Sequence, residues 1–464
     1  MKLLILLFIS FFFASCGKES ETTIENEITP LDTSAIVFTP ADAQGNLISK
    51  RKIKPLNGMG NGPLYVYRDG RFMYDWSETF RDLNVPIIRF HDVEYFNAGN
   101  EAVNISAIFP DEEADAALES SYNFEATDQL MKAAVATGAR IIFRLGENIL
   151  NIASATGSNT PPADFEKWAH VAERIVAHYE DGWNDGYFYK DIMWEVWNEP
   201  DVSKCWDGSF ETYCEFYKAV WQRIHAQHPK ADISPAYAYD AENRAMLYQC
   251  IRENNLGIGH CFVHYYGDDF SRAAEMDAML INELERYELE ADIILGEWNY
   301  LSPEGGFENL TTTFLALQTP FIAAWYAQQL IYMQAAEDLV GAVYYVTDMP
   351  GAWTGLYKLD SAGDVVRLPA YDVFKNFGEL YRLGNEIAPD NLPTGISALA
   401  ASDGKEMGIL IVNYSDESKE TSLVINNIQL DTRTITIDDE ERSSTSGKLP
   451  LTLAPYEVVY VRVR

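Results

Sequence analysis

The sequence repeats one pattern that restricts the fold more than any other feature. Eight short apolar runs, each ending in polar or glycine-rich residues, alternate with longer stretches that can hold a helix. Runs of this length bounded by turn-forming residues are typical of buried strands. The eight expected strands are residues 51–56, 86–90, 140–145, 192–197, 232–236, 261–265, 292–295 and 341–346.

The stretches between these runs have the spacing of amphipathic helices. Apolar side chains recur every three or four residues over 165–179 and 216–224, so each set shares one helix face. Eight strand–helix units in order predict an α/β fold, a closed (β/α)8 TIM barrel over residues 49–385. Functional side chains of such a barrel gather at the carboxyl ends of its strands. An open doubly wound sheet is the alternative.

The pattern changes after residue 385. Alternating apolar runs separated by turn-rich pieces, such as residues 408–413 and 458–463, predict an accessory antiparallel β-sandwich over 386–464. Residues 33–48 also have strand character, and we expect them to contribute a strand to this sandwich. A glycine-rich segment at residues 58–63 lacks the third glycine of a dinucleotide-binding turn, and it is interpreted as the first barrel loop.

The N-terminus has the layout of an export signal. A lysine, an apolar run over residues 3–13 and small residues precede Cys16, and the run is too short to span a bilayer. Residues 13–16 resemble the lipobox of bacterial lipoproteins, in which the cysteine is lipidated. We therefore expect a signal peptide over 1–15, a flexible tether over 16–32, and an outer-membrane or cell-surface lipoprotein. An ordinary signal peptide is the alternative.

Charge and cysteine content restrict the partners and the redox state. The chain has 70 acidic against 35 basic residues, a net charge of −35, which works against nucleic acid because phosphate binding requires a basic face. Cys205, Cys214, Cys250 and Cys261 remain after export to an oxidising compartment. Sequence proximity favours disulfides between the first two and between the last two, whereas buried free thiols are the alternative. No cysteine and histidine pattern has the spacing of a zinc site.

Two glutamates follow expected strands of the barrel. Glu199 lies in an Asn-Glu-Pro sequence after the fourth strand, where the proline ends the strand, and Glu297 follows the seventh. In a closed barrel both would reach the same mouth. Glycoside hydrolysis requires such a pair, because one carboxyl protonates the leaving oxygen while the other attacks the sugar or activates water. The chain also has many surface carboxylates, but placement after two barrel strands favours Glu199 and Glu297 as the catalytic pair.

Several short sequences together resemble family 39 of the glycoside hydrolases, the β-xylosidase and α-L-iduronidase family. They are Arg-Phe-His at residues 89–91, Glu-Val-Trp-Asn-Glu-Pro at 195–200 and Glu-Trp-Asn at 297–299, followed by a terminal β-sandwich. The resemblance covers nearly the whole mature chain. It implies a retaining mechanism with Glu199 as acid/base and Glu297 as nucleophile, through a covalent glycosyl–Glu297 intermediate. It also implies a carbohydrate substrate and no cofactor or metal.

The resemblance also implies roles for individual side chains. Asn198 would bind the substrate 2-hydroxyl, Arg89 would position the nucleophile, and His91 would line the sugar site. His264 matches a histidine of the clan, and Tyr266, two positions later, would contact the nucleophile through its hydroxyl.

Two tryptophans are further candidates for contact with the sugar. Trp298 follows the second glutamate, and Trp353 follows the last strand, where core packing is the alternative to sugar stacking. Trp298 stands where a smaller aromatic is commoner in the family, and Asp92 stands where a glycine is expected. Xylose specificity therefore does not follow from the resemblance.

Three functional hypotheses remain open from the sequence. The first is an exo-acting glycosidase that removes xylose-like or related sugars from plant-wall or host oligosaccharides. The second is an endo-acting β-glycanase of the same clan, and the third is a non-catalytic glycan-binding lipoprotein. Carboxyl groups about 5–5.5 Å apart would favour retention, whereas about 6.5–9.5 Å would favour inversion.

Overall fold

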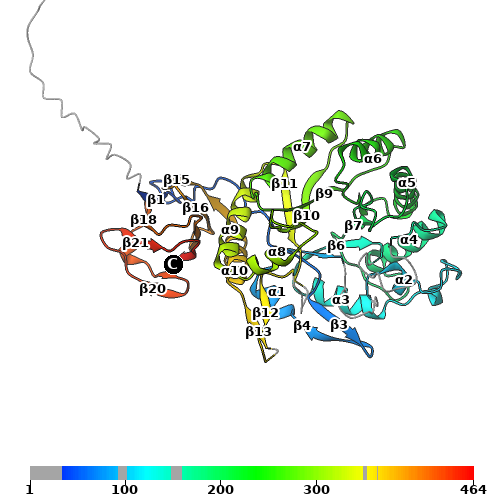
Figure 1. Ribbon diagram of the computed structural model, residues 1–464, viewed down its shortest axis with the longest axis horizontal. Helices are drawn as coiled ribbons and strands as arrows, with labels where there is room; N and C mark the ends of the chain where they lie inside the picture. The colour runs from blue at the N-terminus through cyan, green and yellow to red at the C-terminus, as the bar shows by residue number, and fades with distance from the viewer. Residues whose placement is uncertain (1–33, 92–101, 148–158, 348–352, 363) are drawn as a thin grey trace, which may run out of the picture.

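Eight parallel strands form the central sheet of the computed structural model, which describes residues 34–91, 102–147, 159–347, 353–362 and 364–464. The order β8-β7-β6-β5-β2-β11-β10-β9 is circular, since the Gly259 amide donates to the Ile233 carbonyl (2.9 Å) where β9 approaches β8. The predicted (β/α)8 barrel is therefore confirmed (Figure 1). Its strands are β2 (Gly58–Gly60), β5 (Ile87–Phe90), β6 (Arg140–Leu145), β7 (Met193–Val196), β8 (Asp232–Pro235), β9 (His260–Gly267), β10 (Asp292–Tyr300) and β11 (Leu339–Tyr344).

The first barrel strand differs from the prediction. Residues 51–56 contribute one isolated bridge, Lys52 with Asn385, and the strand is instead β2, in the glycine-rich segment interpreted as a loop. A Cβ atom on Gly58 would lie 2.5 Å from the Ala342 carbonyl oxygen of the neighbouring β11. The close approach of the two strands therefore requires glycine at position 58. Because the glycine-rich segment has no apolar periodicity, the sequence pattern did not predict a strand there.

Helices follow the strands in order and surround the barrel (Figure 1). Each of the longer ones has an apolar face on the sheet, with a polar face outward, except α9, which is apolar all round and is covered by the second domain. The ring consists of α1 (Ser77–Asp82), α3 (Glu125–Val135), α4 (Phe165–Asp181), α5 (Phe210–Gln227), α6 (Ala241–Glu253), α7 (Arg272–Arg286), α9 (Pro320–Ala335) and α10 (Pro369–Leu383), with short α2 (Ile105–Ile108) and α8 (Thr311–Ala316) in loops.

The second domain consists of a four-stranded and a six-stranded sheet with a shared apolar core. β1 (Ala35–Phe38) pairs in parallel with β18 (Lys419–Ile425), and its Ile36 and Phe38 are fully buried in that core. The other strands are β14 (Asn385–Ile387), β15 (Pro389–Asn391), β16 (Ile396–Ser402), β17 (Met407–Asn413), β19 (Ile435–Ile437), β20 (Glu440–Arg442), β21 (Lys448–Leu453) and β22 (Val458–Val463).

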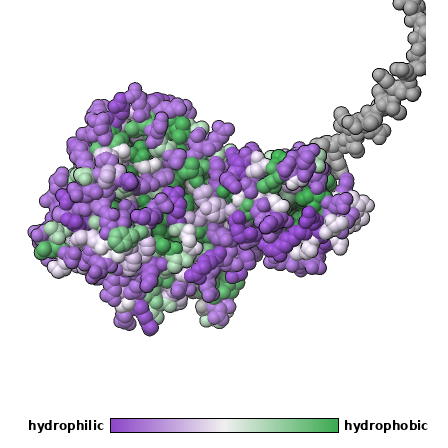
Figure 2. Space-filling view, turned by 180° about the vertical axis from the view of Figure 1, so that it is seen from behind, coloured by the Kyte–Doolittle hydropathy of each residue, from purple (hydrophilic) through white to green (hydrophobic). Residues whose placement is uncertain are grey.

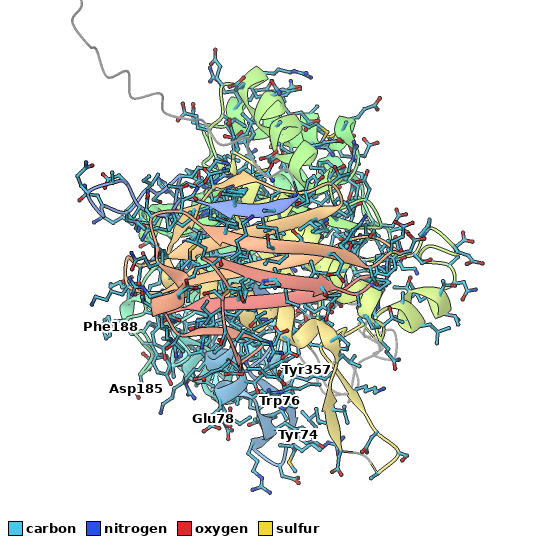
Figure 3. The ribbon with its side chains drawn as sticks, turned by 90° about the vertical axis from the view of Figure 1, so that its left-hand side faces the viewer. Tyr74, Trp76, Glu78, Asp185, Phe188 and Tyr357 are labelled. Carbon is cyan, nitrogen blue, oxygen red and sulfur yellow. The ribbon has the colours of Figure 1, made fainter. Side chains whose placement is uncertain are left out.

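Two hairpins extend from the barrel beside each other. They are β3 (Leu64–Arg68) with β4 (Arg71–Asp75), and β12 (Tyr357–Leu359) with β13 (Val365–Arg367). Trp76 and Tyr357 join their bases by an edge-to-face contact with ring centroids 4.8 Å apart (Figure 3).

The outer surface in Figure 2 is mostly hydrophilic, in keeping with the strongly negative net charge. Over the ranges that the structure describes, none of the helices is both long and apolar enough to cross a bilayer.

Candidate active site

Glu199 and Glu297 lie together at the carboxyl end of the barrel. One carboxylate oxygen of each glutamate and a ring nitrogen of His264 all lie within 4.8 Å of one another. Glu199 follows β7 after a sharp turn in which both Trp197 (φ 72°) and Glu199 (φ 40°) adopt left-handed backbone conformations. Such strained conformations are frequent at functional sites, because surrounding contacts must hold them.

Glu297 lies within β10 at a shift of the strand register. The pairing of β10 with β9 skips Gly296 and then brings Glu297 opposite His264 and Asn299 opposite Tyr266. Irregularities of this kind re-aim side chains, and they are frequent next to active sites. The strand thus places two side chains of β9 beside the Glu297 carboxylate.

Arg89 of β5 connects the carboxylates at the centre of the site. Its guanidinium donates from Nε and Nη2 to Glu195 (2.6 and 3.0 Å), from Nη1 to Glu297 Oε1 (2.7 Å) and from Nη2 to Asn198 Oδ1 (2.9 Å). Arg89 is 1% exposed. Burial alone would lower the pKa of Arg89, but the charges of Glu195 and Glu297 raise it, so the side chain remains a cation.

Glu297 is surrounded by positive charge and hydrogen-bond donors. Besides Arg89, His91 Nε2 lies 3.1 Å from Oε1, and the Tyr266 hydroxyl donates to Oε2 (2.6 Å). Burial alone would raise the pKa of Glu297, but the charges of His264, His91 and Arg89 and the Tyr266 hydrogen bond hold it well below its usual range. The carboxylate is therefore ionised at neutral pH.

Glu199 has a different environment on each of its two oxygens. Oε1 accepts from His264 Nδ1 (2.6 Å) and from the Tyr239 hydroxyl (2.8 Å), whereas Oε2 faces the Cys205 thiol at 3.7 Å. Burial alone would lower the pKa of His264, but the charge of Glu297 and the hydrogen bond to Glu199 raise it. His264 therefore acts as a donor between the two glutamates, 3.7 Å from Glu297 Oε2.

Trp353 lies in an aromatic group beside the site. Its ring contacts Tyr266 (centroids 5.8 Å apart) and Phe307 (6.2 Å), and Phe307 also contacts Tyr266 (5.4 Å). Phe307 is 60% exposed, so the group extends from the Glu297 carboxylate to the surface. The predicted position of Trp353 near the sugar site is compatible with this arrangement.

The prediction that Trp298 contacts the sugar is wrong. The side chain is 0% exposed and packs against Trp325, Tyr326 and Phe374 of the outer helices. Successive strand residues point to opposite faces, so Glu297 faces the barrel mouth and Trp298 faces the helices. A residue next to the catalytic position in sequence therefore lies in the core.

The predicted disulfides are also absent, and all four described cysteines are free thiols, the alternative allowed by the sequence. Cys205 faces Glu199, the Cys250 thiol of α6 donates to the Cys214 carbonyl of α5 (3.7 Å), and Cys261 contacts Tyr248 (3.5 Å). Sequence neighbours therefore belong to different layers of the fold. Cys16 and Asp92 lie outside the described residues.

Two important residues were missed by the sequence analysis. Glu195 is the bidentate partner of Arg89. It could have been found as a charged residue within an otherwise apolar, buried strand. Tyr239 lies in the loop after β8, where no periodicity or motif marks it.

The site could offer oxygen and nitrogen ligands to a cation, but hydrogen bonds already engage them. Glu199, Glu297 and His264 have ligand atoms close enough to share one ion. The guanidinium of Arg89 and the hydroxyls of Tyr239 and Tyr266 donate to the same carboxylates, so a cation would have to displace them. The residues therefore fit proton-transfer chemistry better than metal binding.

Comparison with known proteins finds a family similarity over part of the chain. A model of the glycosyl hydrolases family 39 matches residues 70–290, which include Arg89, Asn198, Glu199 and Tyr266 but end before Glu297. A beta-xylosidase of Geobacillus stearothermophilus is 24% identical over 137 residues, which are 27% of this chain. The chain aligns with only about a quarter, 26%, of the length of that relative.

Solved structures share the fold at low sequence identity. A glucosidase from Croceicoccus marinus has a TM-score of 0.73 at 18% identity, covering 93% of this chain and 98% of its own. A monomeric beta-xylosidase from Caulobacter crescentus CB15 has a TM-score of 0.68 at 14% identity, covering 93% and 99%. A GH39 enzyme from Xanthomonas axonopodis pv. citri has a TM-score of 0.65 at 15% identity, covering 93% and 97%.

Replacing Arg89 by methionine tests the charge network. The change leaves Glu195 and Glu297 buried without their cation, which should cost about 3–5 kcal/mol of unfolding free energy at neutral pH. In the wild type the lowered pKa of Glu297 gives stability above the unfolded-state pKa, and this stability is lost as pH falls. In Arg89→Met, protonation of Glu195 and Glu297 instead removes their unpaired charges. The difference in unfolding free energy between the wild type and this variant should therefore become smaller between about pH 7 and pH 4.

Chemical denaturation at several pH values measures this deficit. Arg144→Met is a comparison variant that also removes a buried guanidinium. Arg144 donates to the main-chain carbonyls of Glu147 and His91. Burial raises the pKa of the Glu147 carboxyl and the charge of Arg144 acts to lower it, so the deficit of Arg144→Met should change less with pH than the deficit of Arg89→Met, which frees two carboxylates. A deficit for Arg89→Met that stays constant or widens toward acid pH would contradict the role of Arg89.

The family match, the barrel with its terminal sandwich and the paired carboxylates agree with one another. Glu199 follows β7 and Glu297 lies within β10, and Arg89, which binds Glu297, is part of the matched region. Over residues 70–290 the chain is similar to the glycosyl hydrolases of family 39.

Proposed function

We propose that this enzyme cleaves glycosidic bonds with retention of the anomeric configuration, with Glu297 as nucleophile and Glu199 as acid/base. The distance between the two carboxylates carries this proposal, since oxygens of the two lie within 4.8 Å. Retaining enzymes hold their carboxyl groups about 5–5.5 Å apart, whereas inverting enzymes need about 6.5–9.5 Å to admit a water molecule. Carboxylate oxygens this close to each other support direct attack by a carboxylate.

The first step forms a covalent intermediate. Glu297, kept ionised by Arg89 and its neighbours, attacks the anomeric carbon as the bond to the leaving oxygen breaks. Glu199 gives its proton to that oxygen, and the leaving group departs as an alcohol. In the second step Glu199 takes a proton from water, the resulting hydroxyl attacks the anomeric carbon, and the Glu297 carboxylate is released. One water molecule is consumed, and no cofactor takes part.

The remaining polar side chains bind the sugar in this proposal. Arg89 holds Asn198 Oδ1, and the amide nitrogen of Asn198 has a long contact to Cys205 Sγ (3.9 Å) and a second hydrogen that can be donated to the 2-hydroxyl. His91, beside Glu297, lines the sugar site. His264 orients the glutamates from its buried position, and Trp353 stacks on the sugar with Phe307 next to it.

We further propose a terminal xylose or a related sugar as the residue removed. The names of similar proteins support this, since they include a beta-xylosidase, a glucosidase and an alpha-L-arabinofuranosidase of Thermotoga maritima. Release of monosaccharide alone from plant-wall or host oligosaccharides would support exo action, and release of longer products would favour the endo-acting alternative. A non-catalytic glycan-binding protein is disfavoured because both glutamates are present in a supported geometry.

Glutamine variants test the assigned roles. Glu297→Gln should abolish measurable turnover of aryl xylosides, glucosides and arabinofuranosides, because the amide cannot form the intermediate. Glu199→Gln should lower turnover of substrates with poor leaving groups by about 10²–10⁴-fold, the usual contribution of general acid/base catalysis. Initial rates measure both effects.

Glu304→Gln provides the control. Glu304 is an exposed carboxylate in the loop after β10, and its loss should leave turnover unchanged. Full activity in Glu297→Gln, or equal losses in all three variants, would exclude the proposed mechanism.

We also propose that the enzyme is exported and anchored to the outer membrane or cell surface by lipid on Cys16. The charge, apolar run and small residues before Cys16 support this location. Cys16→Ala should abolish incorporation of labelled palmitate and move the enzyme from the membrane fraction to the soluble fraction. If the wild type incorporates no labelled palmitate and Cys16→Ala fractionates as the wild type does, the lipid anchor is contradicted.

A further inference from the structure

Tyr239 holds one oxygen of the acid/base carboxyl. It lies in the loop between β8 and α6, and its hydroxyl donates to Glu199 Oε1 (2.8 Å), the oxygen that also accepts from His264 Nδ1 (2.6 Å). Burial and the negative charge of Glu199 raise the pKa of Tyr239, so the phenol keeps its proton. The Tyr239 contact is therefore a donation, and the raised pKa of His264 makes its Nδ1 the second donor to Oε1.

The loop that carries Tyr239 is fixed on both sides. Arg244 donates to the Tyr239 carbonyl (2.6 Å) and is held in turn by a bidentate ion pair with Glu283 of α7 (2.7 and 2.8 Å). The Asp240 amide donates to Asp201 Oδ2 (2.8 Å), and Asp201 is two residues after Glu199. The loops after β7 and β8 are thus joined, and the Tyr239 hydroxyl is held in place before substrate binds.

These contacts distinguish the two oxygens of Glu199. A protonated carboxyl donates from one oxygen and accepts at the other. Oε1 already receives two donors, whereas the contact recorded at Oε2 within the described residues is the Cys205 thiol at 3.7 Å, a weak one. We propose that Tyr239 is a positioning residue that, with His264, fixes Oε1 as the acceptor and so assigns the transferred proton to Oε2.

This inference rests on the proposed function and names the atom that performs it. In the first step the proton on Oε2 passes to the leaving oxygen, and in the second step Oε2 takes a proton from water. Tyr239 keeps its own proton throughout. Because Tyr239 is 43% exposed and contacts the acid/base rather than the nucleophile, its ring borders the leaving-group side of the site.

A merely structural tyrosine would behave differently with different leaving groups. Tyr239 also contacts Tyr237 edge to face (centroids 4.9 Å apart), so packing is the competing explanation. A phenyl glycoside needs a proton on its leaving oxygen, whereas a 2,4-dinitrophenyl glycoside releases a stable anion without one. Loss of acid positioning should therefore affect the first substrate alone, and a packing defect should affect both.

The experiment compares kcat/KM for phenyl and 2,4-dinitrophenyl β-D-xylosides in full-length protein. Tyr239→Phe should lower kcat/KM for the phenyl substrate roughly tenfold or more, which is a part of the full acid/base contribution. It should keep kcat/KM for the dinitrophenyl substrate within about twofold of the wild-type value. Tyr265→Phe is the matched control, because the Tyr265 hydroxyl donates to the Asp269 carbonyl (2.7 Å), and both values should be retained.

The outcomes separate this inference from the proposed function. Glu199→Gln serves as the reference, because it should lower kcat/KM for the phenyl xyloside alone. If Glu199→Gln behaves in this way but Tyr239→Phe lowers kcat/KM equally for both substrates, or for neither, the role of Tyr239 is overturned. If the wild type cleaves neither these xylosides nor the corresponding glucosides and arabinofuranosides, the proposed function fails and the inference fails with it.

Discussion

The ion pairs of Arg89 are the interaction on which the site depends. Its guanidinium binds Glu195 of β7 and Glu297 of β10 while lying in β5, so one side chain connects three strands of the barrel. Buried ion pairs add little net stability over apolar packing, but a carboxylate left without its partner is costly. We infer that the network is retained for the geometry that it imposes on the glutamates.

The same charges give the two glutamates different surroundings. Glu297 is enclosed by Arg89, His91 and Tyr266, which hold its pKa low and keep it ionised as a nucleophile must be. Glu199 is engaged on Oε1 by Tyr239 and His264, whereas its Oε2 faces the Cys205 thiol. In the proposed mechanism these different neighbours give two carboxylates of the same chemical type separate roles at one barrel mouth.

The sequence was sufficient where a residue's role depends on its place along a strand. Glu199 and Glu297 could be placed together at one end of the barrel because both follow apolar strand residues, but β2 was missed because its glycines have no apolar pattern. Trp298 was misplaced because alternation within β10 turns it away from its neighbour. The free state of the four cysteines and the contact of Tyr239 with Glu199 depend on how distant segments pack, which a single sequence does not reveal.

Trapping the covalent intermediate tests the central claim most directly. A 2-deoxy-2-fluoro glycoside with a dinitrophenyl leaving group slows both chemical steps but lets the intermediate form, and mass spectrometry of the digested protein locates the sugar. The account predicts one glycosyl group on the peptide that contains Glu297, formed as activity is lost. A sugar on another residue, or turnover with inverted product and no adduct, would contradict it.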